Sequence, residues 1–367
     1  MRIGIPREIK PQEGRVAFLP GHVAVLTGKG HEVLVEQGAG VQSGAPDAAY
    51  EQSGAVIAAS AQEVFGASEM IVKVKEILPE EYPLLRRDHI LFTNIHAALN
   101  RPQLDRFLEV GLAAVSAENT HPFGSPNCAL AGEIGALEAV RLCLAPYGGT
   151  GRHFMGHFGA APLKALVLGL GNVGRGALRV LLGLGASVVG LDVFAGARRA
   201  ARLDWHDRSL VVNDISALSD HLPTVDVVIN CVLWPKTRTD HLITRRMLTD
   251  MQPGALIVDI SCDTAGAVET SRPTNWSDPI YIVDGVRHFC VDNIPGAVPV
   301  TASAGYGEAI LPKVAAIASM GLTAACLADP WLARGLTCVD GELLLAEAAE
   351  VQQRPFTPVE DWLARRQ

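Results

Sequence analysis

Residues 165–192 read ALVLGLGNVGRGALRVLLGLGASVVGLD, and this stretch decides how the rest of the chain is interpreted. A short apolar run is followed by a glycine-rich turn, by apolar residues at helical spacing, and by a second apolar run. This order predicts a strand at 165–168, a tight turn, a helix at 175–184 and a second strand at 187–191. Together they make one βαβ unit with parallel strands.

The turn inside this unit carries glycines at the spacing G-x-G-x-x-G. The first glycine permits a sharp turn, the second lets the backbone approach a pyrophosphate, and the third lets the helix pack closely on the strand. The phosphates then face the N-terminus of the helix. The predicted dinucleotide-binding turn comprises Gly169, Gly171, Asn172, Val173 and Gly174.

Asp192 ends the second strand, 23 residues after Gly169. A carboxylate at this place accepts hydrogen bonds from the hydroxyls of an adenosine ribose and repels a 2′-phosphate. The sequence therefore predicts that the cofactor is NAD in preference to NADP.

Length and composition narrow the class of protein. At 367 residues the chain exceeds the usual size of one domain, so two domains are expected. A hydrophobic content of 49% with 19% charged residues is typical of a well-buried α/β protein. The net charge of −8, without a basic stretch, argues against nucleic acid or an anionic membrane as a partner.

The sequence shows no signal peptide, no apolar run of membrane-spanning length and no C-x-x-C pair among its seven cysteines. We therefore expect a cytoplasmic protein with reduced cysteines. His153 and His157 have the i, i+4 spacing of metal ligands, but a glycine interrupts them and no third ligand accompanies them. No metal is predicted.

Strand-like and helix-like runs alternate along the chain, which predicts parallel sheets covered by helices on both faces. Further helices are predicted at 21–29, 102–110 and 307–327. Further strands are predicted at 2–5, 32–36, 70–75, 90–95 and 112–116 before the glycine turn, and at 209–212, 225–231, 255–260, 281–283 and 289–291 after it.

The glycine turn lies near the middle of the chain, so a separate α/β domain is expected to precede the cofactor domain. The residues that follow the predicted helix 307–327 are too few for a third domain. We therefore expect them to return to the first domain, which makes that domain discontinuous.

Several residues suited to binding an acid gather in the first domain. Arg15 lies in a loop after the first strand, and Lys73 and Lys75 are expected to share one face of strand 70–75. Lys75, His96 and Glu118 all fall at the carboxyl ends of strands, where ligands collect in an open parallel sheet. A lysine at a strand end is usually only solvated, and a lone histidine usually has a structural role. The prediction therefore rests on the shared location of these residues at the carboxyl ends of strands.

The start MRIGIPREIKPQEGRVAFLPGHV resembles that of the alanine dehydrogenases and of the related pyridine nucleotide transhydrogenase domain. Other similar segments are HEVLVEQGAG, IVKVKE, ILFTNIHAA, VLWP, YIVDGVRHFCVDNIPGAVP and PFTPVEDWLA. The resemblance implies an α/β fold of two Rossmann-like, doubly wound parallel-sheet domains. Residues 1–126 and 300–367 would form a discontinuous catalytic domain, and residues 127–299 the NAD-binding domain.

The resemblance also implies an activity. Such enzymes interconvert an L-amino acid with its 2-oxo acid, ammonia and NADH, in a homo-oligomer that is often a hexamer. By position, Arg15 and Lys75 match the residues that bind the substrate carboxylate, for which a guanidinium offers paired hydrogen bonds. His96 matches the general acid/base, and Asp263 matches the aspartate that orders water or ammonia. The expected catalytic residues are His96, Asp263 and Lys75.

Four further residues complete the predicted site. Glu118 is expected to contact the substrate, and Asn293 to lie near the nicotinamide. Val232 and Leu233, in the VLWP segment, are expected to contact the cofactor.

Three segments depart from the alanine dehydrogenase pattern. They are DTAG at 263–266, where the family has Asp-Gln-Gly-Gly, GEIGAL at 132–137, where it has Ser-Glu-Val-Ala-Gly-Arg, and the loop RHFMGHF at 152–158. Further on, GYGE at 305–308 stands where the family has Ala-Leu-Thr-Asn. ISCDT at 260–264 and VDNIP at 291–295 resemble the lysine-forming saccharopine dehydrogenases equally. A second interpretation is therefore an oxidoreductase acting on a larger amino acid or a secondary amine. A third is an NAD(H)-binding domain like that of a transhydrogenase.

Overall fold

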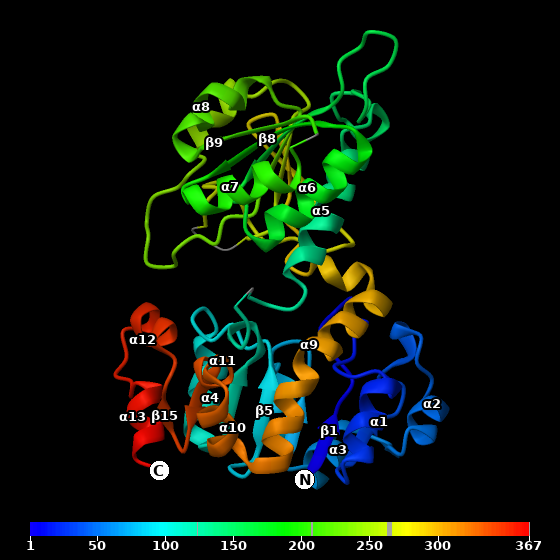
Figure 1. Ribbon diagram of the computed structural model, residues 1–367, viewed down its shortest axis with the longest axis vertical. Coiled ribbons are helices and arrows are strands. Elements are labelled where there is room, and N and C mark those ends of the chain that lie inside the picture. The colour runs from blue at the N-terminus through cyan, green and yellow to red at the C-terminus, as the bar shows by residue number, and fades with distance from the viewer. Residues whose placement is uncertain (123, 207, 263–265, 367) are drawn as a thin grey trace. The chain divides into compact units, whose positions relative to one another are not determined.

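The chain forms two compact units. Met1–Asn127 and Val298–Gln367 make the first, which we call the discontinuous unit, and Cys128–Ala297 make the second, which we call the inserted unit. The computed structural model (Figure 1) describes residues 1–122, 124–206, 208–262 and 266–366.

The discontinuous unit is built around an eight-stranded sheet with the order β3-β2-β1-β4-β5-β6-β14-β15. Strands β1 to β6 run parallel, β14 pairs antiparallel with β6, and β15 pairs antiparallel with β14 at the edge of the sheet. The strands are β1 (Arg2–Ile5), β2 (Glu32–Glu36), β3 (Val56–Ala58), β4 (Met70–Val72), β5 (Ile90–Thr93), β6 (Ala113–Ser116), β14 (Leu336–Val339) and β15 (Glu342–Leu343).

Apolar residues cover both faces of this sheet, because successive side chains of a strand point to opposite sides. In β4, Met70 and Val72 belong to the core that includes helix α9, whereas Ile71 belongs to the core that includes α3 and α4. The helices are α1 (Pro20–Gly28), α2 (Asp47–Gln52), α3 (Ala61–Ala67), α4 (Arg101–Val110), α9 (Pro299–Met320), α10 (Leu322–Ala328), α11 (Pro330–Arg334), α12 (Ala346–Gln352) and α13 (Val359–Ala364), with 3₁₀ helices η1 (Val41–Ser43), η2 (Pro79–Leu84) and η3 (Ala117–Asn119).

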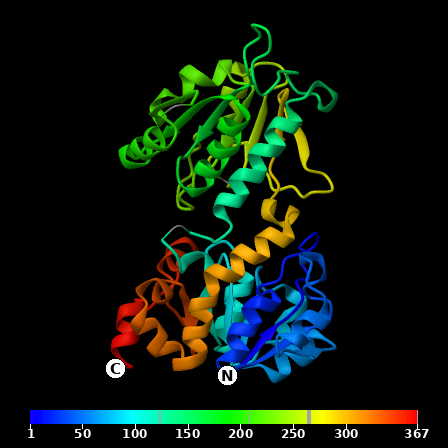
Figure 2. The same ribbon diagram turned by 45° about the vertical axis from the view of Figure 1, so that its right-hand side comes forward.

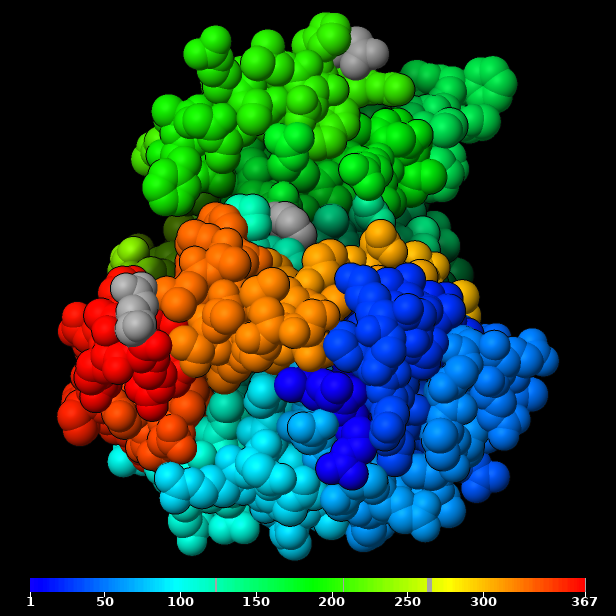
Figure 3. Space-filling view, turned by 60° about the horizontal axis from the view of Figure 1, so that its bottom comes forward, coloured from blue at the N-terminus to red at the C-terminus, as the bar shows by residue number. Residues whose placement is uncertain are grey.

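The two ends of the chain share this unit. Figure 3 shows the C-terminal residues, in orange and red, lying beside the N-terminal residues, in blue, on one surface of the unit. In its sheet, β14 from the C-terminal part pairs with β6 from the N-terminal part.

The inserted unit contains a seven-stranded sheet with the order β9-β8-β7-β10-β11-β13-β12, in which only the edge strand β12 is antiparallel. Figure 2 shows helix α5 running along this sheet, where it packs on α6. The elements are α5 (Cys128–Leu142), β7 (Lys164–Leu168), α6 (Asn172–Leu184), β8 (Ser187–Asp192), α7 (Ala195–Asp204), β9 (Leu210–Asp214), α8 (Leu218–His221), β10 (Val227–Asn230), β11 (Leu256–Asp259), β12 (Ile280–Val283) and β13 (Val286–Phe289), with 3₁₀ helices η4 (Ala145–Tyr147), η5 (Ile215–Ala217), η6 (Leu222–Thr224), η7 (Arg245–Asp250) and η8 (Ile294–Ala297).

The predicted α/β class with two doubly wound, largely parallel sheets is confirmed, but three element predictions are wrong. The strand predicted at 70–75 ends at Val72, and the strand predicted at 289–291 is β13, which ends at Phe289. The single helix predicted at 307–327 is two helices. The break falls at Gly321, whose φ of +83° lies in the left-handed region that glycine adopts without strain.

Candidate active site

In the discontinuous unit, the direction of strand order reverses between β1 and β4. Open α/β sheets bind ligands outside the carboxyl ends of their strands at such a point. The chain leaving β1 carries Arg15, and the chain leaving β4 carries Lys75. The structure therefore brings these two predicted residues to one edge of the sheet, close enough for the charge of Arg15 to act on Lys75.

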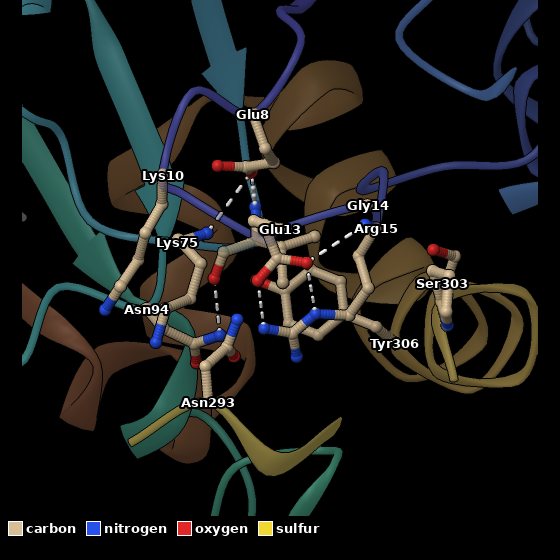
Figure 4. A network of polar contacts seen from close by, with 12 residues as sticks. Glu8, Lys10, Glu13, Gly14, Arg15, Lys75, Asn94, Asn293, Ser303 and Tyr306 are labelled. Carbon is tan, nitrogen blue, oxygen red and sulfur yellow. Dashed lines mark hydrogen bonds and ion pairs between the residues drawn. The ribbon is translucent and has the colours of Figure 1, made fainter. Parts of the chain in front are cut away.

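The guanidinium of Arg15 is buried and faces the carboxylate of Glu13 (Figure 4). Arg15 Nε donates to Glu13 Oε1 at 2.7 Å, and Nη2 donates to Oε2 at 2.5 Å. A bidentate pair of this kind fixes the orientation of the guanidinium plane. Glu13 therefore occupies the Nε–Nη2 edge of the guanidinium.

The loop that carries Arg15 is held from several sides. Gly14 lies so close to Gln42 that a Cβ on it would come within 2.6 Å of Gln42 Oε1. The hydroxyl of Ser43 donates to Gly14 O at 2.9 Å, and the N–H of Val16 donates to Ser303 Oγ at 3.0 Å. The position of Arg15 is thus built into the fold, partly through helix α9.

Lys75 is buried beside the carboxylate of Glu76, which also binds Lys10. Its Nζ lies 3.6 Å from Glu76 Oε2, and Lys10 Nζ donates to Glu76 Oε1 at 2.9 Å. Burial alone would raise the pKa of Glu76, but the two ammonium groups hold it at about 2. Burial lowers the pKa of Lys75, and Glu76 offsets only part of this effect. Another anion would therefore stabilise the charged form of Lys75.

Lys73 has a different environment from Lys75, contrary to the shared strand face that was predicted. It is fully buried and forms ion pairs with Glu81 and, at 3.5 Å, with Glu8. Burial opposes its charge, but these two carboxylates raise its pKa above the usual value. Lys73 is thus a structural residue, buried beneath the carboxyl edge of the sheet.

His96 and Glu118 follow the neighbouring strands β5 and β6. The side chain of His96 is 54% exposed and that of Glu118 is 15% exposed. His96 Nδ1 lies 3.9 Å from Glu118 Oε1, and this carboxylate also accepts hydrogen bonds from the backbone. The exposed imidazole is accessible to a ligand, as a general acid/base must be.

In the inserted unit, the predicted glycine turn connects β7 to α6. Gly169 has a φ of +82°, and a Cβ on Gly174 would come within 1.9 Å of Gly169 O. Gly171 is the N-cap of α6, and a Cβ there would meet no atom within 4 Å. The main chain is therefore open at Gly171, where a pyrophosphate would approach the helix N-terminus. These residues fit the predicted cofactor.

Asp192 ends β8 next to this turn. Its Oδ2 accepts a hydrogen bond from the N–H of Leu170, and its Oδ1 accepts one from the N–H of Phe194, both at 2.7 Å. A carboxylate has about four acceptor sites, so two main-chain bonds leave capacity for ribose hydroxyls. The main-chain bonds fix Asp192 against the glycine turn.

Apolar side chains flank the turn on both sides. Phe194 follows β8 and is 72% exposed, and Leu233 follows β10 and is 82% exposed. Val232, before Leu233, is partly buried, and its N–H donates to Asn230 Oδ1 at 3.2 Å. Exposed apolar groups at this edge suit the flat face of an adenine. Phe194 was not predicted.

Asn293 and Asp263 were also predicted to lie at the site. Asn293 is buried, and its carbonyl accepts a hydrogen bond from Trp276 Nε1 at 3.2 Å. Asp263 lies outside the described residues. Glu13, Lys10 and Glu76 were not predicted. The signal for Glu13 and Lys10 is the alternating charge of REIKPQEGR at 7–15, and Glu76 directly follows Lys75 in IVKVKE at 71–76.

His153 and His157 lie in the segment between α5 and β7. His153 Nδ1 is 2.9 Å from Met155 O, and His157 pairs with Ala160 in a short antiparallel bridge. Within the described ranges, no group of three or more His, Cys, Asp or Glu residues is arranged to hold a metal ion.

If only the strands β1 to β6 of one unit and the six parallel strands of the other are counted, both sheets have the order 3-2-1-4-5-6 that defines the Rossmann fold. The remaining strands lie at one edge of each sheet. One unit carries a dinucleotide-binding turn and the other a cationic edge. This combination is typical of a two-domain, dinucleotide-dependent enzyme.

Comparison with known proteins identifies the family. Residues 4–123 match the model of the alanine dehydrogenase/PNT N-terminal domain, and residues 136–346 match the model of the C-terminal domain. PNT denotes pyridine nucleotide transhydrogenase. The chain belongs to the alanine dehydrogenase/PNT family.

Relatives match over nearly the whole chain. An alanine dehydrogenase of Mycolicibacterium smegmatis is 36% identical over 99% of this chain and 100% of its own, and one of Bacillus subtilis is 35% identical over 98% and 97%. A solved L-alanine dehydrogenase has a TM-score of 0.88 at 35% identity, covering 96% of this chain and 99% of its own. A transhydrogenase from Sinorhizobium meliloti shares the fold at 24% identity, with a TM-score of 0.76, covering 94% and 99%.

Proposed function

We propose that this chain is an NAD-dependent L-amino acid dehydrogenase of the alanine dehydrogenase type. It would convert a small L-amino acid, NAD and water to the 2-oxo acid, ammonium, NADH and a proton, and would catalyse the reverse reaction. Membership of the family makes it an NAD-dependent oxidoreductase acting on the CH–NH2 group of its donor. L-alanine is the first candidate substrate, because the relatives named above are alanine dehydrogenases.

One observation carries this proposal. Arg15 and Lys75 are both nearly buried at the switch point of the discontinuous unit, and each is held by a neighbouring carboxylate. Two cations fixed in this way suit the carboxylate and the 2-oxo or amino group of an amino acid. The exposed His96 follows the next strand and supplies a proton carrier.

The proposed mechanism assigns one task to each residue. Bound NAD would supply the hydride acceptor for Cα, held by the inserted unit. Arg15 binds the substrate carboxylate at its Nη1–Nη2 edge, and Lys75 donates to a carboxylate or carbonyl oxygen. His96 takes and returns the protons as water adds to the imine and ammonia leaves. Asp263 is proposed to order the water or ammonia.

The cofactor would be held by the inserted unit. The amides at the start of α6 would face the pyrophosphate, in the turn formed by Gly169, Gly171, Asn172, Val173 and Gly174. Asp192 would bind the ribose, and Val232, Leu233 and Asn293 would contact the rest of the cofactor.

We also propose a cytoplasmic homo-oligomer, in line with the resemblance. Among the helices that the structure describes, none combines the length and the apolar character needed to cross a membrane.

A substrate panel tests the function. NADH formation is measured with L-amino acids, and NADH consumption with 2-oxo acids plus ammonium or plus L-lysine, each with NADP(H) in parallel. We expect turnover with L-alanine and with pyruvate plus ammonium, and a preference for NAD. Turnover with a 2-oxo acid plus L-lysine, but not with pyruvate plus ammonium, would overturn the proposal in favour of secondary-amine chemistry.

A further inference from the structure

His96 and Glu118 occupy matching places after two paired strands. Strands β5 and β6 are parallel, and Thr93, the last residue of β5, is opposite Ser116, the last residue of β6. His96 follows β5 by three residues, and Glu118 follows β6 by two. Both therefore leave the sheet at its carboxyl edge, side by side.

The carboxylate of Glu118 binds the main chain that carries the imidazole. Its Oε1 accepts a hydrogen bond from the N–H of His96 at 2.7 Å, and its Oε2 accepts one from the N–H of Ile95 at 3.1 Å. Two successive amides thus point at one anion. This arrangement fixes the peptide between residues 95 and 96.

The backbone at His96 needs such a restraint. Its φ is +51°, in the left-handed region that a residue with a Cβ rarely adopts. Conformations of this kind persist only where the surrounding structure enforces them, and they gather at functional sites. In the left-handed region the Cα–Cβ bond points in a different direction from that in an extended strand, so φ at this residue decides where the imidazole lies.

Other side chains hold the rest of the loop. Gln103 Nε2 donates to Ile95 O at 2.9 Å, and Gln352 Nε2 donates to Ala97 O at 2.7 Å and to Ala98 O at 3.3 Å. The loop therefore keeps anchors before and after His96 when Glu118 is altered. Among the described hydrogen bonds, the one that Glu118 Oε1 accepts is the one that restrains the N–H of His96 itself.

We propose that Glu118 is a positioning residue, which holds His96 in the left-handed conformation that directs its imidazole toward the substrate. This inference deepens the proposed function, because it rests on His96 as the general acid/base. It is an alternative to the expectation that Glu118 contacts the substrate. Its two main-chain hydrogen bonds, from the N–H groups of Ile95 and His96, are the contacts through which it would act on the imidazole.

A double-mutant cycle with Glu118→Gln and His96→Ala tests the inference. The glutamine keeps one acceptor oxygen, but its NH2 group meets an N–H donor, so one of the two bonds is lost. We expect kcat to fall by about 10- to 100-fold, as for a small displacement of a catalytic group. KM for the 2-oxo acid and the Kd of NADH should stay within about twofold. In the His96→Ala background, Glu118→Gln should change kcat by less than about twofold, because a positioning residue acts only through its partner.

Glu69→Gln is the matched control. Glu69 Oε2 also accepts a main-chain hydrogen bond, from the N–H of Arg2 at 2.8 Å, but at the amino edge of the same sheet. This variant should keep the kcat of the unaltered chain.

Three results would overturn the inference: a rise in KM at unchanged kcat, an equal loss of kcat with and without His96, or an unchanged kcat. If His96→Ala alone keeps its rate, the proposed acid/base role fails separately. A crystal structure of Glu118→Gln then decides about Glu118. A negative φ at residue 96 supports the positioning role, and a φ that stays near +51° contradicts it.

Discussion

The two sheets share one strand order but present different chemistry at their switch points. In the discontinuous unit, between β1 and β4, the edge is formed by charged side chains, with Arg15 held by Glu13 and Lys75 beside Glu76. In the inserted unit, between β7 and β10, the edge is formed by bare main chain at a glycine turn. The same topology therefore supports recognition by side chains in one unit and by main chain in the other.

The difference follows from what each edge would bind. A small acid offers few atoms, so the protein must supply directed charge, and each buried charge needs its own partner. A dinucleotide offers a pyrophosphate that fits a helix N-terminus, so the protein must mainly keep side chains away. Charge substitutions should therefore act on one edge and steric substitutions on the other.

The largest expected effect concerns the side-chain edge. His96→Ala should lower kcat by about 10²- to 10⁴-fold, the usual range for loss of a general acid/base. The Kd of NADH, measured by fluorescence titration, should not change, because the proposed cofactor turn is in the inserted unit. Lower thermal stability with a normal rate would show that His96 is structural.

Arg15→Lys should lower kcat/KM by about 10²-fold, within the 2–5 kcal/mol typical of losing one partner of a buried charge pair. A lysine keeps the charge, but it cannot bind Glu13 and a substrate carboxylate along two edges of one plane. Steady-state kinetics with the best substrate of the panel provide the measurement. Arg245→Lys is the control, because Arg245 makes a similar bidentate pair with Asp284 at an exposed site.

Glu76 should make stability depend on pH. Its folded-state pKa of about 2 lies below the ordinary 4.5, so its carboxylate stabilises the fold above pH 4.5 and loses this effect as the pH falls toward 2. The difference in unfolding free energy between the unaltered chain and Glu76→Gln should be about 2 kcal/mol smaller at pH 3 than at pH 7. Urea unfolding at both pH values measures it. An equal difference at both pH values would contradict the ion-pair account.

The main-chain edge gives the smallest expected effect. Gly171→Ala adds a methyl group where no atom lies within 4 Å, so the melting temperature should not fall. The methyl would occupy the space of the pyrophosphate, and the Kd of NADH should rise by about tenfold, or about 1.4 kcal/mol. Gly183→Ala, in the same helix and equally uncrowded, is the control. Unchanged affinity in Gly171→Ala would show that the turn does not approach a phosphate.

Local patterns carried most of the fold prediction. β1 and β2 have the predicted bounds, because each is a short, strand-like run between loops. β13 was misplaced because Arg287 and His288 look like loop residues. Both are buried, since Arg287 donates to Leu142 O at 2.7 Å and to Gly254 O at 2.8 Å, while His288 Nε2 is 2.8 Å from Thr270 Oγ1. The partners that make this burial possible are far away in sequence.

The dependence on partners that are distant in sequence also explains which parts of the site could be predicted. The glycine turn could be predicted because its residues are neighbours in the sequence. The end of β4 could not, because the N–H of Val74 leaves the sheet ladder and donates to Glu8 Oε1, in the loop after β1, at 2.6 Å. The hydrogen bond from the N–H of His96 to Glu118 likewise depends on the pairing of β5 with β6.

The discontinuous unit also constrains the order of events during synthesis. A ribosome completes Cys128–Ala297 before it makes Val298–Gln367, so the inserted unit can fold while the first unit still lacks α9 and β14. Until then the edge of β6 has no partner, and Lys73 O lacks the hydroxyl of Tyr306, which donates to it at 2.9 Å in the finished protein. The cationic edge is therefore assembled last, after the inserted unit that carries the cofactor turn.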